Sequence, residues 1–485
     1  MIADHIAIFE NLNKRNWSDI EPSIFGTLFE RIIDESKRKQ LGAHYTSRED
    51  IELIVEPVLM QPLRAAWGET KTKASPWCDW KKLDEPDQDF SRSRLKTILI
   101  EFQERLASTR VLDPACGSGN FLYVSLALLK ALEKEVIAYA RNYGLHEISH
   151  KVHPKQLFGI ELNTYAHELA GVVVWIGYLQ WKHRNGLDLR SEVPILQPLK
   201  NILLADAIVD RSDAANPIEP EWPEADIIVG NPPFLGSKKL RSELKDPYVD
   251  AVFEVWGDRV PREADLCCYW FEKTRAEIES GRAKRAGLLA TQGIRGGKNR
   301  LVLDRIAESG SIFWAQSDRP WALEGAAVRV SMVGFDDGSE KTRELDDMAV
   351  GEIHTNLRSG ETDVTKARRL IENLGIAFMG DTKGGSFDIA ASVAKRLLAQ
   401  PNPDGRSNVD VIRPWVNGLD ITRRPRDMWI IDFPPGTILD EAALYEAPFE
   451  YARKSVKPTR AGNKRAAYVE NWWLHMEPRP GMRAA

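Results

Sequence analysis

Three short apolar runs, each ending in an acidic residue, constrain the fold of this chain more than any other feature. They occupy residues 111–113, 156–161 and 201–206, and their last residues are Asp113, Glu161 and Asp206. The first two runs are followed by segments whose apolar residues recur at helical spacing. Strands that alternate with helices predict an α/β fold with a parallel sheet, so the three carboxylates belong to successive strand ends.

A glycine turn, Asp113-Pro114-Ala115-Cys116-Gly117-Ser118-Gly119, follows the first run and leads into a helix at about residues 122–141. Its two glycines let the backbone approach a ligand closely, and the amino terminus of the helix points at that ligand. An acid at the end of the second strand is where nucleotide-binding folds hold ribose hydroxyls. A lone Gly-x-Gly is often merely a tight turn, but here the acids, the glycines and the helix together predict a nucleoside-type cofactor site.

A second motif, Asn231-Pro232-Pro233-Phe234, follows the apolar run at residues 225–230. Asn supplies an acceptor oxygen, the prolines hold the backbone extended with free carbonyls, and Phe supplies an aromatic face. This combination suits a flat molecule that carries an exocyclic amino group. Asn-Pro alone favours a simple strand-ending turn, but the glycine turn upstream favours a binding site.

Both motifs resemble those of a known family. The segment 113–119 resembles motif I of class I S-adenosylmethionine-dependent methyltransferases, and 231–234 resembles motif IV of DNA enzymes that methylate amino groups. Residues 41–47 are similar to the cofactor-side motif of gamma-order adenine methyltransferases, with Ser47 where many carry Pro. The resemblance extends over nearly the whole chain to the methyltransferase part of MmeI-like type IIG/IIL restriction–modification enzymes, through segments 22–31, 262–271 and 417–422.

This resemblance implies a Rossmann-like class I methyltransferase sheet with helices on both faces, a helical cap before it and the start of a target-recognition domain after it. The runs 311–315 and 328–335 resemble the antiparallel pair that closes such a sheet. The implied cofactor is S-adenosyl-L-methionine, and the implied cofactor-binding residues are Tyr45, Thr46, Asp113, Ala115, Gly117, Gly119, Asn120, Phe121, Glu161 and Asp206.

Individual roles also follow from the resemblance. The glycine turn would hold the methionine part of the cofactor, and Tyr45 with Thr46 would close that end. Glu161 would bind the ribose hydroxyls and Asp206 the adenine amino group. The implied catalytic residues, which would hold the target base, are Asn231, Pro232, Pro233 and Phe234.

The implied activity is site-specific methylation of the exocyclic amino group of an adenine that is flipped out of double-stranded DNA. Such an adenine-specific DNA methyltransferase would serve a restriction–modification or related defence system. Two alternatives stay open. One is an amino-methyltransferase that acts on RNA or on a protein glutamine, and the other is a catalytically inactive remnant that binds DNA.

The net charge of −5 does not indicate a nucleic-acid-binding protein, but the basic residues are clustered. Segments 281–300 and 451–465 each contain six basic residues and no acid, and three more basic residues follow the catalytic motif directly. A solvated face is the ordinary explanation for one such run, whereas three acid-free runs favour contact with phosphates. The predicted DNA-binding residues are Lys238, Lys239, Arg241, Arg295, Lys298, Arg453, Lys454, Lys457 and Arg460.

The 485 residues are long enough for more than one domain. We expect an N-terminal helical cap at 1–60, a surface excursion at 61–95, the methyltransferase core at 96–338, a bridging segment at 339–408 and a partial target-recognition region at 409–485. In the last region aromatic residues and arginines alternate. Four cysteines form neither a disulfide framework nor a zinc spacing, so no metal is expected.

Several absences complete these expectations. There is no signal peptide, and the longest apolar run, near 169–179, is too short to span a membrane, which predicts a cytoplasmic protein. The related fused enzymes carry a nuclease domain before the cap, whereas here only residues 1–42 precede Ala43-His44-Tyr45-Thr46. We therefore expect no nuclease activity, a shortened recognition region, and as partners double-stranded DNA and a separate nuclease or specificity polypeptide.

Overall fold

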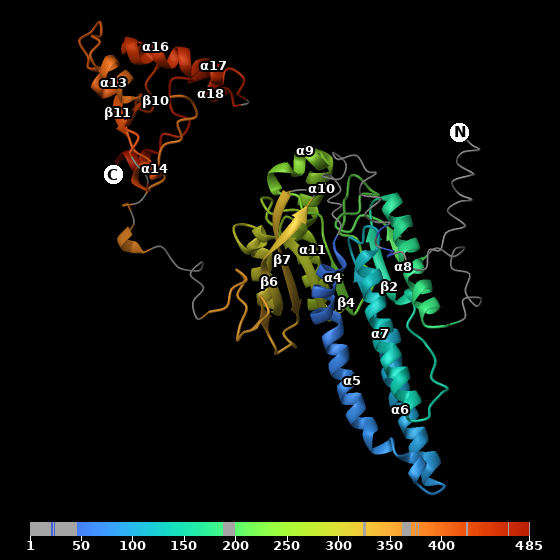
Figure 1. The fold of residues 1–485 in the computed structure, drawn as a ribbon. Coiled ribbons are helices and arrows are strands. Elements are labelled where there is room, and N and C mark those ends of the chain that lie inside the picture. The colour runs from blue at the N-terminus through green and yellow to red at the C-terminus, as the bar shows by residue number, and fades with distance from the viewer. Residues whose placement is uncertain are drawn as a thin grey trace. The chain divides into compact units, whose positions relative to one another are not determined.

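The computed structural model describes residues 21–22, 24, 46–187, 199–323, 326–360, 370–373, 375–376, 378–422, 425–463 and 465–484. Contacts divide the chain into two units, Met1–Thr365 and Lys366–Ala485 (Figure 1). The expected bridging segment at 339–408 is thus shared between the two units. Most of the expected N-terminal cap, including Tyr45, lies outside the described residues.

The first unit contains a nine-stranded sheet in the order β3-β2-β1-β4-β5-β7-β6-β8-β9. Strands β1 to β5 are parallel, whereas β7 runs antiparallel between β5 and β6. The predicted strands and the predicted antiparallel pair are therefore all present. The strand bounds are β1 (Val111–Asp113), β2 (Leu157–Glu161), β3 (Ile202–Leu204), β4 (Ile227–Gly230), β5 (Arg285–Thr291), β6 (Ser311–Leu323), β7 (Ala326–Asp336), β8 (Glu344–Leu345) and β9 (Met348–Ala349).

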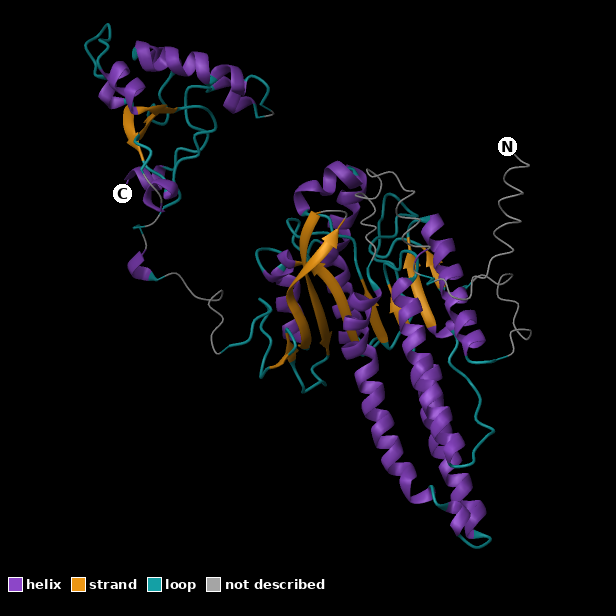
Figure 2. Cartoon of the chain, viewed as in Figure 1, coloured by secondary structure: helices purple, strands orange, loops and turns teal. Residues whose placement is uncertain are grey.

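Helices cover both faces of this sheet, as expected for the fold class (Figure 2). Successive strand residues point to opposite faces, so Val111 and Ile227 enter one apolar core while Leu112 and Ile228 enter another. The first core also takes residues from α4 (Arg48–Val55), α5 (Gln61–Ala74), α6 (Asp87–Ser108), α7 (Asn120–Asn142) and α8 (Thr164–Arg184). The second takes residues from α9 (Leu240–Leu244), α10 (Asp246–Trp256), α11 (Cys267–Glu279) and α12 (Arg300–Ser309).

The strand order positions the site. Strands β2 and β3 follow on one side of β1, while β4 and β5 lie on its other side. Ligands of open α/β sheets bind at such a reversal of strand order, beyond the carboxyl ends of the strands. Because Val111 pairs with Ile227 and Leu112 with Ile228, the glycine turn and the Asn-Pro-Pro-Phe motif leave neighbouring strands at the same edge.

Residues 61–95, expected as a surface excursion, are mainly helical. A π-helical turn, Glu56–Met60, joins α4 to α5, which packs with α6 and α7 in an arm that extends beyond the sheet (Figure 1). Trp67 is buried there, with its ring 5.1 Å from that of Phe102 and its Nε1 2.7 Å from Glu135 Oε1. These contacts of Trp67 connect α5 to α6 and α7.

The second unit has a small antiparallel sheet in the order β10-β12-β11. Its core includes Phe387, Phe433, Trp472 and Trp473, so part of the aromatic pattern of the C-terminal region serves packing. The strands are β10 (Asp388–Ala390), β11 (Ile412–Trp415) and β12 (Met428–Ile431). The helices are α13 (Ala391–Leu398), α14 (Gly418–Thr422), α15 (Leu439–Ala443), α16 (Glu446–Ser455), α17 (Lys457–Arg460), α18 (Ala466–Glu470) and α19 (Pro480–Ala484).

Among the described residues of both units, no helix combines the length and the apolar character needed to cross a membrane.

Candidate active site

A cavity of about 950 Å³ lies at the edge where β1, β2, β3 and β4 end. Ten of the predicted site residues line it, namely Thr46, Asp113, Ala115, Gly117, Asn120, Phe121, Glu161, Asp206, Asn231 and Pro233. Gly119, Pro232 and Phe234 belong to the same two loops but do not line the cavity, and half-buried Phe234 packs against both apolar cores. The structure therefore brings both sequence motifs to one cavity of a size usual for a small-molecule site.

The glycine turn is shaped by a close approach to α8. Gly119 has φ of 85°, and a Cβ there would lie 3.1 Å from the backbone of Ala170. Its N–H donates to the carbonyl of Cys116 over 2.7 Å, and α7 begins at the next residue, Asn120. Asn120 Oδ1 is buried without a hydrogen-bond partner among the described residues. The amino terminus of α7 and this free acceptor both belong to the wall of the cavity.

Asp113 lies at the end of β1 and is fully buried. Its Oδ1 accepts a hydrogen bond of 3.1 Å from Ala115 N. Burial raises the pKa of this carboxyl to about 8, and the nearby charge of Glu161 acts in the same direction. Gly230 on β4 lies against it, because a Cβ at that position would be 2.5 Å from Asp113 Oδ1. Any side chain at position 230 would therefore require the buried carboxyl of Asp113 to shift.

Glu161 ties the end of β2 to the glycine turn. Its Oε2 accepts from Gly117 N over 2.9 Å, and its Oε1 accepts from Asn163 N over 2.7 Å. Burial raises the pKa of this carboxyl above its usual value, although these backbone N–H groups oppose the shift. Each oxygen of a carboxylate can accept more than one hydrogen bond, so Glu161 can hold the turn and still receive two hydroxyl donors from a ligand.

Asp206 follows β3 and is held from two sides. Its Oδ1 accepts from Ile208 N and Val209 N over 2.9 and 3.1 Å, and its Oδ2 accepts from the Tyr248 hydroxyl over 2.9 Å. Burial, with the neighbouring charge of Asp206, raises the pKa of Tyr248 well above its usual range, so this hydroxyl stays a donor. Tyr248 lines the cavity from α10, and no motif in the sequence indicated it.

Asn231 is oriented by a residue that lies far away in the sequence. Its Nδ2 donates to Thr46 Oγ1 over 3.1 Å, just before α4 begins. Its Oδ1 is buried and has no partner among the described residues. A buried acceptor without a donor is costly, so the geometry leaves one amide oxygen ready for an N–H from a ligand in the cavity.

Sequence reasoning missed two further residues of the wall, Leu266 and Trp270. Trp270 is buried on α11, and its Nε1 donates to the carbonyl of Pro114 over 2.9 Å. This hydrogen bond therefore supports the glycine turn from the face of the sheet that α11 covers, which is opposite to the face that α7 and α8 cover. Both residues lie in the segment 262–271, whose only signal in the sequence was the family resemblance.

The predicted DNA-binding residues differ widely in their surroundings. Lys238, Lys239 and Lys298 are exposed and form no ion pair with any residue that the structure describes. The others have partners within the chain. Arg241 pairs with Asp246 and Asp250, Arg295 with Asp318, Arg453 and Lys454 both pair with Glu450, and the Lys457 ammonium lies 5.3 Å from the ring centre of Trp472.

The prediction that Arg460 contacts DNA is wrong, because its side chain is buried in the second unit with 2% exposure. Its guanidinium donates hydrogen bonds of 2.6–3.3 Å to four backbone carbonyls, those of Lys383, Gly384, Asn471 and Leu474. From the sequence alone, a basic side chain that faces solvent cannot be told from a buried one that links three chain segments by hydrogen bonds.

Arg460→Ala should therefore destabilise the second unit. The substitution leaves buried carbonyls without donors, so we expect a loss of about 2–4 kcal/mol in unfolding free energy. Scanning calorimetry of the whole chain measures it. Arg453→Ala, at an exposed residue of the same basic run, should change stability by no more than about 0.5 kcal/mol. Weaker DNA binding with unchanged stability in Arg460→Ala would instead support the predicted contact between Arg460 and DNA.

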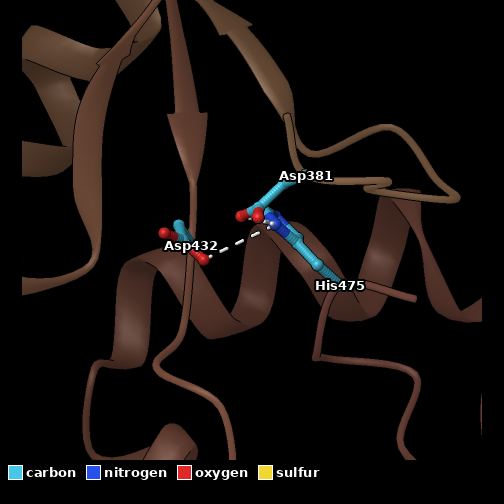
Figure 3. Close-up of side chains that lie close together, drawn as sticks. All are labelled: Asp381, Asp432 and His475. Carbon is cyan, nitrogen blue, oxygen red and sulfur yellow. Dashed lines mark hydrogen bonds and ion pairs between the residues drawn. The ribbon is translucent and has the colours of Figure 1, made fainter. Parts of the chain in front are cut away.

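Asp381, Asp432 and His475 form a cluster in the second unit (Figure 3). One potential ligand atom from each lies within 4.8 Å of the others. However, Arg483 on α19 donates to both oxygens of Asp432 over 2.7 and 2.8 Å and also pairs with Asp381. The guanidinium neutralises the carboxylates that a metal ion would need. The cluster is better described as an ion-pair network that fastens α19 to the end of β12.

Comparisons with known proteins agree with this geometry. Residues 87–346 match the family described as "MmeI, DNA-methyltransferase domain". "DNA methyltransferase A" of Bacillus subtilis (strain 168) is 28% identical over 334 residues, which are 66% of this chain and 34% of that protein. "Adenine-specific methyltransferase BrxX" of Escherichia coli O9:H4 (strain HS) is 24% identical over 204 residues, 40% of this chain and 16% of that protein.

A solved structure has a similar fold. The type IIL restriction–modification enzyme MmeI in complex with DNA superposes with a TM-score of 0.67 at 22% identity, covering 96% of this chain and 61% of that one. At this identity the likeness shows the fold alone. The chain spans about a third of the Bacillus subtilis protein and less than two thirds of the MmeI chain.

Proposed function

The chain belongs to the MmeI DNA-methyltransferase domain family, and from that premise we propose that it methylates the exocyclic amino group of adenine in double-stranded DNA. S-adenosylmethionine is the proposed methyl donor, and a restriction–modification or related defence system is the proposed context. The observation that carries the proposal is the buried Oδ1 of Asn231, which has no hydrogen-bond partner among the described residues. Asn231 lines the same cavity as the glycine turn.

The residues of the cavity fit the proposed cofactor. Glu161 would accept from ribose hydroxyls, and Asp206, fixed by Tyr248, would accept from the adenine amino group. The turn at Gly117, where a Cβ would meet nothing within 4 Å, leaves room for the methionine part, and Asn120 Oδ1 offers a free acceptor for its ammonium group. When bound, S-adenosylmethionine supplies a methyl group that its sulfonium has already activated.

The chain's own contribution is to position the acceptor nitrogen. An amino group on an aromatic ring is a weak nucleophile, because its lone pair is delocalised. We propose that Asn231 Oδ1 and the carbonyl of Pro232 accept its two hydrogens, although Pro232 does not line the cavity in the present structure. These contacts favour a tetrahedral nitrogen and free the lone pair. Thr46 holds the amide of Asn231 in the orientation that this requires. Fixing the reacting atoms in line is a large part of such catalysis.

The target base must leave the duplex to reach this cavity. Phe234 would stack on the flipped base, although in the present structure its ring packs between the two cores. We propose that the exposed Lys238, Lys239 and Lys298 contact phosphates beside the site, and that residues 409–485 belong to a target-recognition region. A separate nuclease or specificity polypeptide stays a proposed partner.

One assay tests the proposal against its alternatives. The protein is incubated with labelled S-adenosylmethionine and unmodified DNA, and the digested nucleosides are identified by mass spectrometry. N6-methyladenine is the expected product. A methyl group found only in RNA or in glutamine would replace DNA as the substrate. Bound cofactor without any methylated product would instead indicate a DNA-binding remnant.

The pKa of Asp113 links cofactor binding to proton release. With burial raising this pKa to about 8, the carboxyl is mostly protonated at pH 7. A cationic ligand favours the carboxylate and lowers its pKa, so binding should release protons and affinity should rise between about pH 6 and 8, by at most about tenfold per unit.

Calorimetry at pH 7 in buffers of different ionisation enthalpy measures this proton count. Asp113→Asn, which keeps the size of the side chain, should abolish the release. Proton uptake by the unchanged protein, or the same release from Asp113→Asn, would contradict the assignment.

A further inference from the structure

Asp265 joins two loops that the proposed reaction needs. Its Oδ1 accepts from Ser237 N over 3.1 Å, and its Oδ2 accepts from Asn299 Nδ2 over 2.8 Å. Asp265 N in turn donates to Asn299 Oδ1 over 2.8 Å, so the two residues form a reciprocal pair. Next to it, Leu266 N donates to the carbonyl of Leu235 over 2.9 Å. We call this arrangement the Asp265–Asn299 pair.

The first loop carries the catalytic motif. Ser237 begins a short 3-10 helix, Ser237–Lys239, three residues after Phe234. The second loop follows β5 and contains a 3-10 turn, Gln292–Arg295, then Gly296, Gly297 and Lys298. Each loop therefore presents exposed lysines within two residues of its contact with the Asp265–Asn299 pair. The pair fixes the spacing between the basic residues and the cavity.

Both loops come close to the pair. A Cβ at Gly236 would lie 3.6 Å from Asp265 Oδ1, and a Cβ at Gly293 would lie 3.4 Å from Asn299 Nδ2. Lys238, Lys239 and Lys298 are all exposed. Buried Leu235 and Ile294 anchor one part of each loop, so loss of the pair should loosen the exposed segments that carry these lysines.

The side chain of Asn299 binds Asp265 and does not cap helix α12. It occupies the position before α12, where asparagine side chains usually bind the first free N–H groups of a helix. Here its side chain makes no such bond and is directed to Asp265 instead, with a longer bond of 3.4 Å to the carbonyl of Gly293. The contact between the loops has taken the place of a local stabilising interaction.

We propose that Asp265 is a positioning residue for the target base. It holds the loop that follows Asn-Pro-Pro-Phe and the loop that follows β5 at a fixed position relative to each other. Through Ser237 it fixes the segment that follows Asn-Pro-Pro-Phe, and through Asn299 it fixes the loop that carries Lys298. Phosphate contacts on both loops would then bring one nucleotide to Asn231. This inference rests on the proposed function.

The reciprocal hydrogen bonds allow a test by exchange of the two side chains. In Asp265→Asn the amide keeps only one acceptor oxygen, so its NH2 faces one of the two donors, Ser237 N or Asn299 Nδ2. In Asn299→Asp two carboxylates face each other. Combining both substitutions restores a donor at position 265 opposite a carboxylate at position 299. Only the longer bond from Asn299 to Gly293 is then lost.

The four proteins are compared in steady-state methyl transfer, in calorimetry with S-adenosylmethionine, in affinity for double-stranded DNA and in hydrogen exchange of the two loops. Each single substitution should lower kcat by about tenfold to a hundredfold, since displacements of about 1 Å can cost that much. Cofactor affinity should be unchanged, and the double variant should recover to within about threefold of the wild type. Asp258→Asn, at an exposed aspartate, serves as the control.

Faster amide exchange in both loops of each single variant, reversed in the double variant, is the accompanying signature. Equal kcat in all four proteins would overturn the positioning role, and so would a double variant as impaired as the two losses combined. If the wild type transfers no methyl group, the proposed function fails, while exchange and DNA affinity still decide the inference. Unchanged exchange and affinity in both single variants would then refute it.

Discussion

Asn231→Ala should lower kcat for DNA methylation by at least about a hundredfold and leave the Kd of S-adenosylmethionine within about twofold. The substitution removes the buried Oδ1 that has no partner in the described part of the chain and is proposed to bind the target amino group. That contact forms with the target base and not with the cofactor, so the loss belongs to the chemical step. Radiolabel transfer and calorimetry on the same preparation measure the two quantities.

Two further substitutions make this result specific. Thr46→Val keeps the size of the side chain but removes the acceptor that orients Asn231, so we expect an intermediate loss of about tenfold in kcat. Asn142→Ala, at an exposed asparagine at the end of α7, should have wild-type activity. If Asn231→Ala keeps the wild-type kcat, Asn231 has no role in the mechanism. If it loses cofactor affinity to the same extent as kcat, Asn231 binds the cofactor and not the target base.

Glu161→Ala should weaken cofactor binding by about a hundredfold, the second large effect. Two hydrogen bonds from a charged acceptor to ribose hydroxyls are worth about 1.5–3 kcal/mol each, and part of that is offset by water. The same change leaves the N–H of Gly117 without its carboxylate partner, so the turn itself loosens. Isothermal calorimetry with S-adenosylmethionine gives the Kd directly.

The outcome can be separated from general damage. Glu168→Ala removes an exposed carboxylate of α8 and should leave the Kd unchanged. At saturating cofactor, Glu161→Ala should regain most of its kcat, because its defect lies in binding. A normal Kd together with a low kcat would show that Glu161 acts in catalysis instead.

Much of the sheet could be predicted because each strand is a short contiguous run that ends in a recognisable residue. The same holds for the two motifs, since strand order alone brings the ends of β1 and β4 together. Burial on both faces makes the central strands β1 and β4 mainly apolar, and the turn chemistry marks where they stop. The architecture therefore follows from local pattern and the rules of parallel sheets.

Contacts that depend on tertiary packing could not be predicted in this way. Tyr248 reaches Asp206 across 42 residues, and Asp265 reaches Ser237 across 28. No periodicity or turn signal predicts which residue of α10 will meet a particular carboxylate. The prediction for Arg460 was wrong for the same reason, because a run of basic residues has the same composition whether the side chains face water or backbone carbonyl groups. The helical arm was missed because its helices are stabilised by packing, α5 on α6 and α6 on α7, which no local pattern of residues 61–95 shows.

The hydrogen bond between Thr46 and Asn231 spans 185 residues, and this has a consequence for where the working unit begins. The family match starts at residue 87, so a fragment cut there would keep both recognisable motifs. It would nevertheless lack the Thr46 hydroxyl that orients the amide of Asn231 and the helix whose Ile54 packs against Gly287 of β5. The family match and the set of residues that the proposed reaction needs therefore have different boundaries in this protein. The second includes Thr46, which lies outside the matched residues.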